Sequence, residues 1–227
     1  MKVCAIIPAF NEQERISLTI ASLKSRREIH SIVVVDDGST DATAERAAEA
    51  GATEVIRQKN AGKGAALTRG FAHCRESADV FLLLDADLGA SASESVKLLR
   101  PIEEGTADMV IGLLPPDPEF HATGKSGGRG LVVRLARNGI THRTGQYFEQ
   151  PLSGQRATSK AVLDAIGGMF ASGFGVEVAL TISAIRKGYR LVEVPTEFRH
   201  HVTGGDWKSM VHRGRQFRDV AGALRRS

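Results

Sequence analysis

Two short apolar runs, each ending in acidic residues, constrain this 227-residue chain more than any other feature. Residues 31–35 (SIVVV) lead into a pair of aspartates, and residues 80–84 (VFLLL) lead into Asp85 and Asp87. A branched apolar run of this length predicts a strand buried on both faces, as in a parallel sheet. Because open α/β sheets bind ligands at the carboxyl ends of their strands, these aspartates are predicted to lie at a ligand-binding edge.

Strand-like runs alternate with helical patterns through the first half of the chain. The predicted strands cover residues 2–8, 31–35, 53–57, 80–84 and 108–112, and the predicted helices cover residues 13–26, 41–51, 63–75 and 93–104. The second half is predicted to contain a Pro/Gly-rich loop at 114–130, helices at 131–138, 159–166 and 176–186, a strand at 190–194 and a basic helix at 207–226. This order implies a single α/β domain over residues 1–227, with a doubly wound, mostly parallel sheet and helices on both faces.

Charge is distributed unevenly between the two halves. Residues 1–113 hold 13 Lys/Arg and 17 Asp/Glu, whereas residues 114–227 hold 17 and 9. A basic second half suits an anionic substrate or a membrane surface. Nucleic acid is not an expected partner, because the basic residues are dispersed, aromatic residues make up 5% of the chain and no nucleic-acid-binding motif occurs.

The apolar stretches also bear on the expected location. None reaches the roughly 18 residues that span a bilayer, and the run at residues 3–7 is too short for a signal peptide. Cys4 and Cys74 fall in a predicted strand and a predicted helix, which favours reduced thiols over a disulfide. We therefore expect a cytoplasmic protein, either free or peripheral at the inner face of the membrane.

The triplet Asp85-Ala86-Asp87 is the strongest candidate for chemistry. Isolated triplets of this kind are usually surface turns, but the buried strand predicted before this one favours a functional role. Carboxylates gathered at one place repel each other unless a cation offsets their charge. A hard divalent cation, Mg²⁺ or Mn²⁺, binds carboxylates and phosphates together. The triplet therefore predicts a metal site and a phosphate-bearing substrate.

A second candidate is the short glycine-rich segment around Lys63. Gly62-Lys63-Gly64 lacks the third glycine of a dinucleotide-binding fingerprint, and no Gly-Lys-Ser/Thr of a P-loop occurs. A purely structural interpretation of this segment is a loop that precedes a helix. Its functional interpretation places Lys63 at a helix N-terminus, where its charge and the helix dipole favour anionic phosphates.

Four segments together resemble glycosyltransferases of the GT-A type, which use nucleotide sugars: residues 7–12 (IPAFNE), 35–41 (VDDGSTD), 60–66 (NAGKGAA) and 85–87 (DAD). This resemblance covers nearly the whole chain. It implies a GT-A fold, with residues 1–113 as the nucleotide-binding half and residues 114–227 as the acceptor-binding half. A nucleotidyltransferase remains an alternative, although that class usually has a glycine-rich, basic loop where this chain has residues 8–12. A non-catalytic module that binds nucleotide sugars is another.

The resemblance implies roles for individual residues in the first half. The nucleotide sugar would be held by Pro8, Ala9, Phe10, Glu12, Asp37, Lys63, Asp85 and Ala86. Asp87 would bind the metal most directly, and Asp85 would touch the ribose or the metal. Asp36, Ser39 and Asp41 are more simply interpreted as turn and cap residues. Lys63 would help stabilise the departing diphosphate.

Part of the second half resembles glucosyl-3-phosphoglycerate synthases more narrowly. The segments that carry this resemblance are residues 127–129 (GGR), 150–157 (QPLSGQRA), 173–178 (GFGVEV) and 194–201 (VPTEFRHH). It implies that His201 is a metal ligand. It also implies an acceptor site formed by Gly128, Arg129, Ser153, Gly154 and Arg199. Leu131 stands where those enzymes usually have threonine, and we expect no counterpart here of the N-terminal extension that is common among them.

Glu177 begins the predicted apolar helix. An acid in the first turn is favoured by the helix dipole alone. As a functional residue, Glu177 would lie near the sugar or the acceptor hydroxyl, where it acts as general base if the reaction inverts the anomeric carbon. The resembled synthases retain configuration, and Glu177 would then orient the substrate. Glu177, Asp87 and Lys63 are therefore the candidate catalytic residues.

The basic tail leaves the acceptor open between two classes. An amphipathic helix at residues 207–226 would pack on its own domain or on a second subunit of a homodimer, or it would lie on a membrane surface. We expect transfer of a hexose, glucose by preference, from a nucleoside diphosphate sugar such as UDP-glucose to a small anionic acceptor. The alternative acceptor is a polyprenyl phosphate at the membrane surface, because polyprenyl-phosphate glycosyltransferases are the next family that the chain resembles.

Overall fold

The computed structural model describes residues 1–115, 129–171, 175–199 and 221–224. Within them, one sheet has the strand order β3-β2-β1-β4-β6-β5-β7. The strands are β1 (Val3–Ala9), β2 (Ser31–Asp36), β3 (Glu54–Arg57), β4 (Val80–Leu83), β5 (Met109–Leu113), β6 (Arg156–Ser159) and β7 (Leu191–Pro195). Every pairing is parallel except those of β6 with β4 and β5. The predicted α/β fold with a mostly parallel sheet is confirmed.

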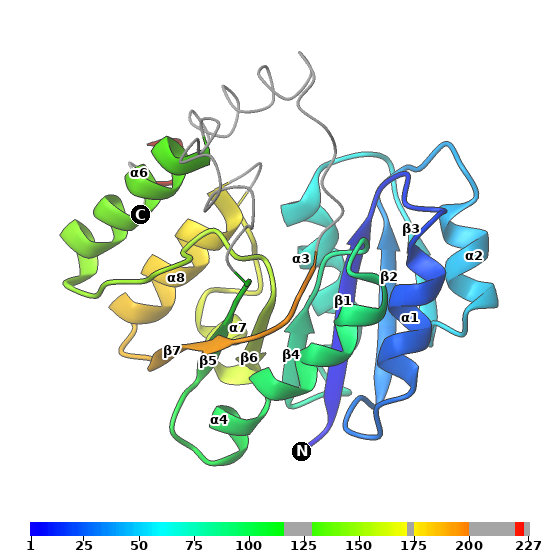
Figure 1. Ribbon diagram of the computed structural model, residues 1–227, viewed down its shortest axis with the longest axis horizontal. Helices are drawn as coiled ribbons and strands as arrows, with labels where there is room; N and C mark the ends of the chain where they lie inside the picture. The colour runs from blue at the N-terminus through cyan, green and yellow to red at the C-terminus, as the bar shows by residue number, and fades with distance from the viewer. Residues whose placement is uncertain (116–128, 172–174, 200–220, 225–227) are drawn as a thin grey trace.

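Helices cover both faces of this sheet (Figure 1). They are α1 (Ile16–Lys24), α2 (Thr43–Glu49), α3 (Lys63–Cys74), α4 (Arg100–Glu103), α6 (Arg129–Thr144), α7 (Lys160–Ala165), α8 (Val176–Arg186) and the 3₁₀ helix η1 (Gly89–Leu98). Alternate residues of β1 pack into two hydrophobic cores, because successive side chains of a strand point to opposite faces of the sheet. Ala5 and Ile7 join the core that contains α1 and η1, and Cys4 and Ile6 join the core that contains α3, α7 and α8.

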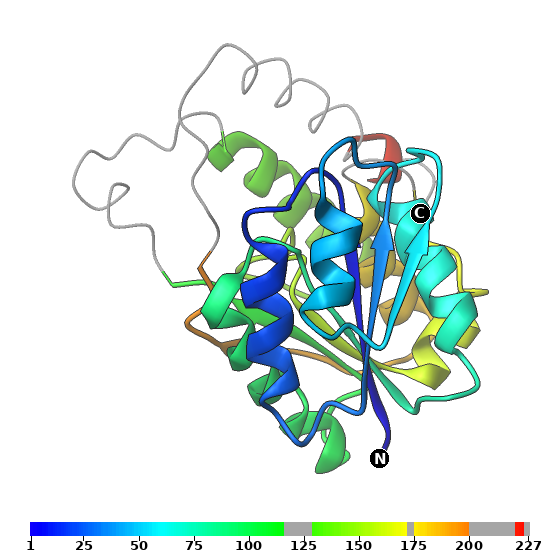
Figure 2. The same ribbon diagram turned by 90° about the vertical axis from the view of Figure 1, so that its right-hand side faces the viewer.

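The register of the central strands brings the predicted ligand-binding turns together. In the parallel pairing of β1 with β2, Ala9 lies opposite Asp36, and in that of β1 with β4, Ile6 lies opposite Leu83. These strands run in one direction through the middle of the molecule (Figure 2). The turns that follow β1, β2 and β4 therefore share one edge of the sheet, as their sequence predicts.

Three elements differ from their predicted form. Helix α6, expected at residues 131–138, covers Arg129–Thr144 and so begins within the loop expected at 114–130. Residues 93–104, expected as one helix, form the end of η1 and the short helix α4, which has proline in its first turn. Pro101 has no amide hydrogen to continue a helical hydrogen-bond series, so the helix restarts there. Strand β6 was not predicted at all. Its sequence, RATS, lacks an apolar run and begins with a buried arginine.

The C-terminal helix expected at residues 207–226 lies mostly outside the described residues. Residues 221–224 are helical, and Leu224 belongs to the hydrophobic cluster that contains Val132, Ala136 and Ile140 of α6. The contact with α6 is close at Gly139, where an added Cβ would lie 2.4 Å from Leu224 Cδ2. This short segment therefore packs on its own domain.

Two further observations concern the core and the membrane. Cys4 and Cys74 are both buried and free. In the part of the chain that the structure describes, no helix combines the length and the apolar character needed to cross a bilayer.

Candidate active site

Three charged side chains from distant parts of the chain meet at the carboxyl edge of the sheet. Lys63 Nζ lies 2.7 Å from Asp85 Oδ1 and 3.0 Å from Glu177 Oε1. Lys63 opens α3, Asp85 follows β4, and Glu177 lies in the first turn of α8. The Glu177 side chain is 11% exposed, whereas those of Lys63 and Asp85 are 31% and 28% exposed. The cluster is thus partly shielded and open on one side.

The electrostatics of this cluster keep Lys63 protonated. Burial lowers the pKa of Lys63, but the charges of Asp85 and Glu177 and their hydrogen bonds outweigh burial. The net result is a pKa of Lys63 above its ordinary value. An ammonium group fixed at a helix N-terminus, between two carboxylates, can bind a phosphate without first acquiring a proton.

Gln155 and Gly154 hold Asp85 in place. Gln155 Nε2 donates to Asp85 Oδ2 at 2.6 Å, and the Asp85 amide donates to Gln155 Oε1 at 3.1 Å. A Cβ added to Gly154 would lie 2.6 Å from Lys63 Nζ and 3.1 Å from Asp85 Oδ2, so a larger residue there would displace the ion pair. Sequence reasoning assigned no role to Gln155, although it lies in the segment 150–157 that resembled known enzymes. Its contact depends on β6, which sequence reasoning also missed.

Arg156 is a buried cation behind this cluster. Its side chain is 1% exposed and donates to the carbonyls of Pro151 and Ser153 and to Thr181 Oγ1, at 3.0, 2.9 and 2.9 Å. Burial lowers the pKa of Arg156 to about 10, and the negative charges of Glu177 and Glu193 limit the fall. The group therefore remains charged at neutral pH.

Arg156 also connects the two sides of the site. Thr181 Oγ1, which accepts from Arg156, donates to the carbonyl of Glu177 at 2.8 Å. The turn that carries Gly154 and the helix that carries Glu177 are thus fixed to one guanidinium group.

Replacing Arg156 is expected to destabilise the fold. Arg156→Met leaves the carbonyls of Pro151 and Ser153 without this donor in a buried region, at a cost of about 3 kcal/mol. For a chain of this size we expect a melting temperature lower by about 6–12 °C. Thermal and urea unfolding measure the loss. Arg190→Met, which removes an exposed guanidinium that pairs with Asp108, is the control and is expected to have a much smaller effect. Equal losses would contradict the buried role.

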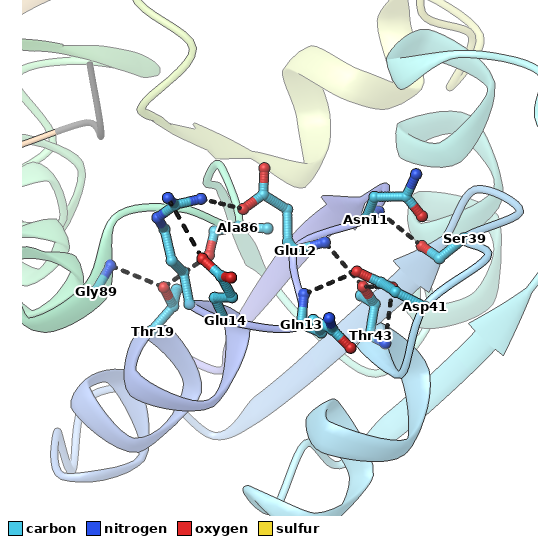
Figure 3. A network of polar contacts seen from close by, with 11 residues as sticks. Asn11, Glu12, Gln13, Glu14, Thr19, Ser39, Asp41, Thr43, Ala86 and Gly89 are labelled. Carbon is cyan, nitrogen blue, oxygen red and sulfur yellow. Dashed lines mark hydrogen bonds and ion pairs between the residues drawn. The ribbon is translucent and has the colours of Figure 1, made fainter. Parts of the chain in front are cut away.

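The turn after β1 is bound to the turn after β2 by a hydrogen-bond network (Figure 3). Asn11, with a φ of 56°, donates its amide to Ser39 Oγ and accepts from the Thr40 amide, both at 2.9 Å. The amides of Glu12 and Gln13 donate to Thr43 Oγ1 and Asp41 Oδ2. Of the predicted nucleotide contacts in this turn, Ala9 is buried, Pro8 and Glu12 are half-buried, and Phe10 is 48% exposed. Their contact with a nucleotide stays a prediction.

Asp37 fixes the segment of chain that leads into Lys63. Its carboxylate is buried and accepts from Gln58 Nε2 and from the amides of Ala61 and Gly62, at 2.6, 2.9 and 2.8 Å. The segment that precedes α3 is therefore held by the turn after β2. Asp36 instead accepts from the Ser39 amide, as expected of a turn residue.

The environment of Asp87 fits a divalent cation. Burial and the charge of Asp87 raise the pKa of Glu12 despite the nearby Arg15. The two negative charges therefore act on each other, and a bound cation would offset this repulsion. Among the described residues, no group of three His, Cys, Asp or Glu side chains is gathered to hold a metal. Two carboxylates suffice for Mg²⁺ or Mn²⁺ when substrate phosphates complete the coordination. The third predicted ligand, His201, lies outside the described residues.

The predicted acceptor residues are only partly described. Ser153 is buried, and its hydroxyl donates to the Gly112 carbonyl at 2.6 Å. Arg199 is exposed, with its amide 3.0 Å from Ser91 Oγ, and Arg129 begins α6. Gly128 lies outside the described residues. Acceptor binding by these residues stays a prediction.

Comparison with protein families and curated proteins gives a consistent result. The model of Glycosyl transferase family 2 matches residues 4–149. The chain is 34% identical to glycosyltransferase AglJ of Haloferax volcanii, over 90% of this chain and 65% of that protein. It is 32% identical to dolichol-phosphate mannosyltransferase of Pyrococcus furiosus, over 87% and 56%, and 32% identical to undecaprenyl-phosphate mannosyltransferase of Micrococcus luteus, over 87% and 84%. The chain thus spans less than two thirds of the length of the first two relatives.

Solved structures add a second group of similar proteins. Glucosyl-3-phosphoglycerate synthase from Mycobacterium tuberculosis, in complex with phosphoglyceric acid, is 27% identical with a TM-score of 0.81, over 98% of this chain and 78% of that chain. A complex of that synthase with Mn²⁺, UDP and phosphoglyceric acid gives 28% and 0.81, over 98% and 77%. The predicted resemblances to GT-A enzymes and to both of these groups are confirmed.

Proposed function

The chain belongs to glycosyl transferase family 2, and we propose that it moves a hexose, glucose by preference, from a UDP-sugar to a small anionic acceptor, with UDP as the leaving group. The observation that carries this proposal is the cluster of Lys63, Asp85 and Glu177 beside Asp87, at the edge where an α/β sheet binds its ligand. Departure of a diphosphate requires positive charge near its oxygens. Asp85 and Asp87 are the pair that would bind a cation, Lys63 is the fixed ammonium, and Glu177 is the shielded carboxylate.

Each residue has a separate task in the proposed reaction. Pro8, Ala9, Phe10, Glu12 and Asp37 hold the nucleoside, at the two turns that the network of Figure 3 joins. Asp87 and Asp85 would hold Mg²⁺ or Mn²⁺, with His201 as a further ligand, and the cation would supply positive charge for the departing diphosphate. Lys63 donates to a phosphate oxygen, and Glu177 faces the sugar and the acceptor, as its position in the first turn of α8 allows.

Two acceptor classes have support from different relatives. Glucosyl-3-phosphoglycerate synthases, whose structures include phosphoglyceric acid, cover 98% of this chain, which supports a small phosphorylated acceptor. The curated relatives that act on dolichol phosphate or undecaprenyl phosphate support a polyprenyl phosphate instead. Both acceptors are anionic and suit the basic second half of the chain.

Nucleotide and metal binding test the shared part of this proposal. UDP-, GDP- and dTDP-sugars are added with and without Mn²⁺, and the melting temperature is measured. A ligand at about 100 times its Kd stabilises by about 2.7 kcal/mol, or roughly 5–10 °C here. We expect a shift for UDP-glucose that requires Mn²⁺. No shift with any nucleotide, in either condition, would overturn the proposal.

Transfer assays then distinguish the acceptors. UDP-glucose and Mn²⁺ are combined with 3-phosphoglycerate in one arm and with a polyprenyl phosphate in detergent in the other. A glucosylated product in the first arm alone supports the small anionic acceptor. A product in the second arm alone supports the lipid acceptor and overturns the first choice.

A further inference from the structure

One buried hydroxyl on α1 holds both ends of the segment that carries Asp87. Thr19 is fully buried, and its Oγ1 donates to the carbonyl of Ala86 and accepts from the amide of Gly89, both at 2.8 Å. Figure 3 shows Thr19 between these two groups. Asp87 lies in sequence between the two residues that Thr19 binds.

The segment depends on a contact of this kind because it does not continue the strand. Strand β4 ends at Leu83, and η1 begins at Gly89, which has a φ of 54°. Gln155 fixes Asp85 at the start of this turn. Thr19 of α1 binds the backbone on both sides of Asp87, so the two aspartates are positioned by separate elements.

We propose that Thr19 is a positioning residue that sets Asp87 for binding of the divalent cation. This inference rests on the proposed function. Partners that orient a metal ligand typically contribute 10- to 100-fold to metal affinity, because a ligand that wanders must be ordered on binding. Thr19 acts only through the backbone around Asp87 and touches neither substrate nor cation.

Helix α1 also supplies a matched control. Ser22, one turn after Thr19, donates to the Ala90 carbonyl at 2.8 Å and accepts from the Ser93 amide at 3.1 Å. It therefore joins the same helix to the same stretch of chain, but beyond the metal-binding residues. Loss of the Ser22 hydroxyl weakens the packing of α1 against η1 without releasing Asp87.

The test measures Mn²⁺ affinity by calorimetry in the presence of saturating UDP. Thr19→Val, which keeps the shape of the side chain and removes its hydrogen bonds, is expected to weaken Mn²⁺ binding about tenfold. Thr19→Ser, which retains the hydroxyl, is expected to stay within about threefold, and Ser22→Ala is expected to match the wild type. UDP binding without metal should be the same in all four proteins.

The outcomes separate this inference from the function it rests on. If the wild type binds no Mn²⁺ with UDP, the proposed function fails and the inference fails with it. If the wild type binds and Thr19→Val binds equally well, only the positioning role is overturned. The positioning role is also overturned if Ser22→Ala loses as much Mn²⁺ affinity as Thr19→Val. Should Thr19→Val unfold at the assay temperature, Thr19→Ala, which adds no methyl group near the main chain, replaces it with the same expected result.

Discussion

Asp87→Asn is expected to lower the rate of metal-dependent sugar transfer by about 10³-fold while the fold stays intact. Asparagine keeps the size of the side chain but removes the negative charge that a divalent cation needs. The carboxyl of Glu12, whose pKa the charge of Asp87 helps to raise, is relieved of that repulsion. The variant should therefore be as stable as the wild type, or slightly more stable, when no metal is present.

Turnover of UDP-glucose across a Mn²⁺ titration and melting temperature without metal are the two measurements. Asp79→Asn provides the control, because Asp79 lies just before β4, at the opposite end of the strand, where it accepts from the Lys2 amide. That variant should retain the wild-type rate. Wild-type turnover by Asp87→Asn would show that Asp87 is not an essential metal ligand.

The first half of the fold could be predicted because its strands are marked by apolar runs that are continuous and close together in the sequence. The apolar runs before Asp36 and Asp85 predicted buried parallel strands, and parallel strands must end at a common edge. The meeting of Lys63 with Asp85, 22 residues later, follows from that geometry. The bounds of β2 and α3 agree with prediction to within one residue.

The second half carried weaker signals, for physical reasons. Strand β6 is antiparallel and begins with Arg156, whose charge is compensated by carbonyl groups that no sequence pattern reveals. Without β6, the bond from Gln155 to Asp85 could not be foreseen. Ser153, whose contact with the acceptor stays a prediction, donates its hydroxyl to the Gly112 carbonyl, a contact that the sequence did not indicate. The contact of Lys63 with Glu177 spans 114 residues, which spacing alone cannot predict.

Lys63→Met is expected to lower both the transfer rate and the free energy of unfolding. Removal of the ammonium leaves Asp85 and Glu177 as facing carboxylates, one of them 11% exposed. Breaking a fully buried pair costs about 3–5 kcal/mol, and solvent at the open side of this cluster reduces the expected cost to about 2 kcal/mol. The lost donor to the departing diphosphate should lower kcat by about 10²- to 10³-fold.

A double-mutant cycle separates the stability effect from the catalytic one. Glu177→Gln alone should slow transfer far more than it weakens UDP binding, because Glu177 faces the sugar and the acceptor in the proposed site. In Lys63→Met/Glu177→Gln, the carboxylate that Lys63 compensated is gone, so about 1 kcal/mol of stability should return. The rate should not return with it, since neither the ammonium nor the carboxylate is restored.

Recovery of stability without recovery of rate would place both residues in the reaction as well as in the fold. For each protein of the cycle, urea unfolding measures the stability, and single-turnover transfer with Mn²⁺ and UDP-glucose measures the rate. Additive stability losses would contradict the ion pair, because independent sites add and contacting charges do not. A wild-type rate in Glu177→Gln would remove that carboxylate from the mechanism, and catalysis would then depend on the cation and Lys63 alone.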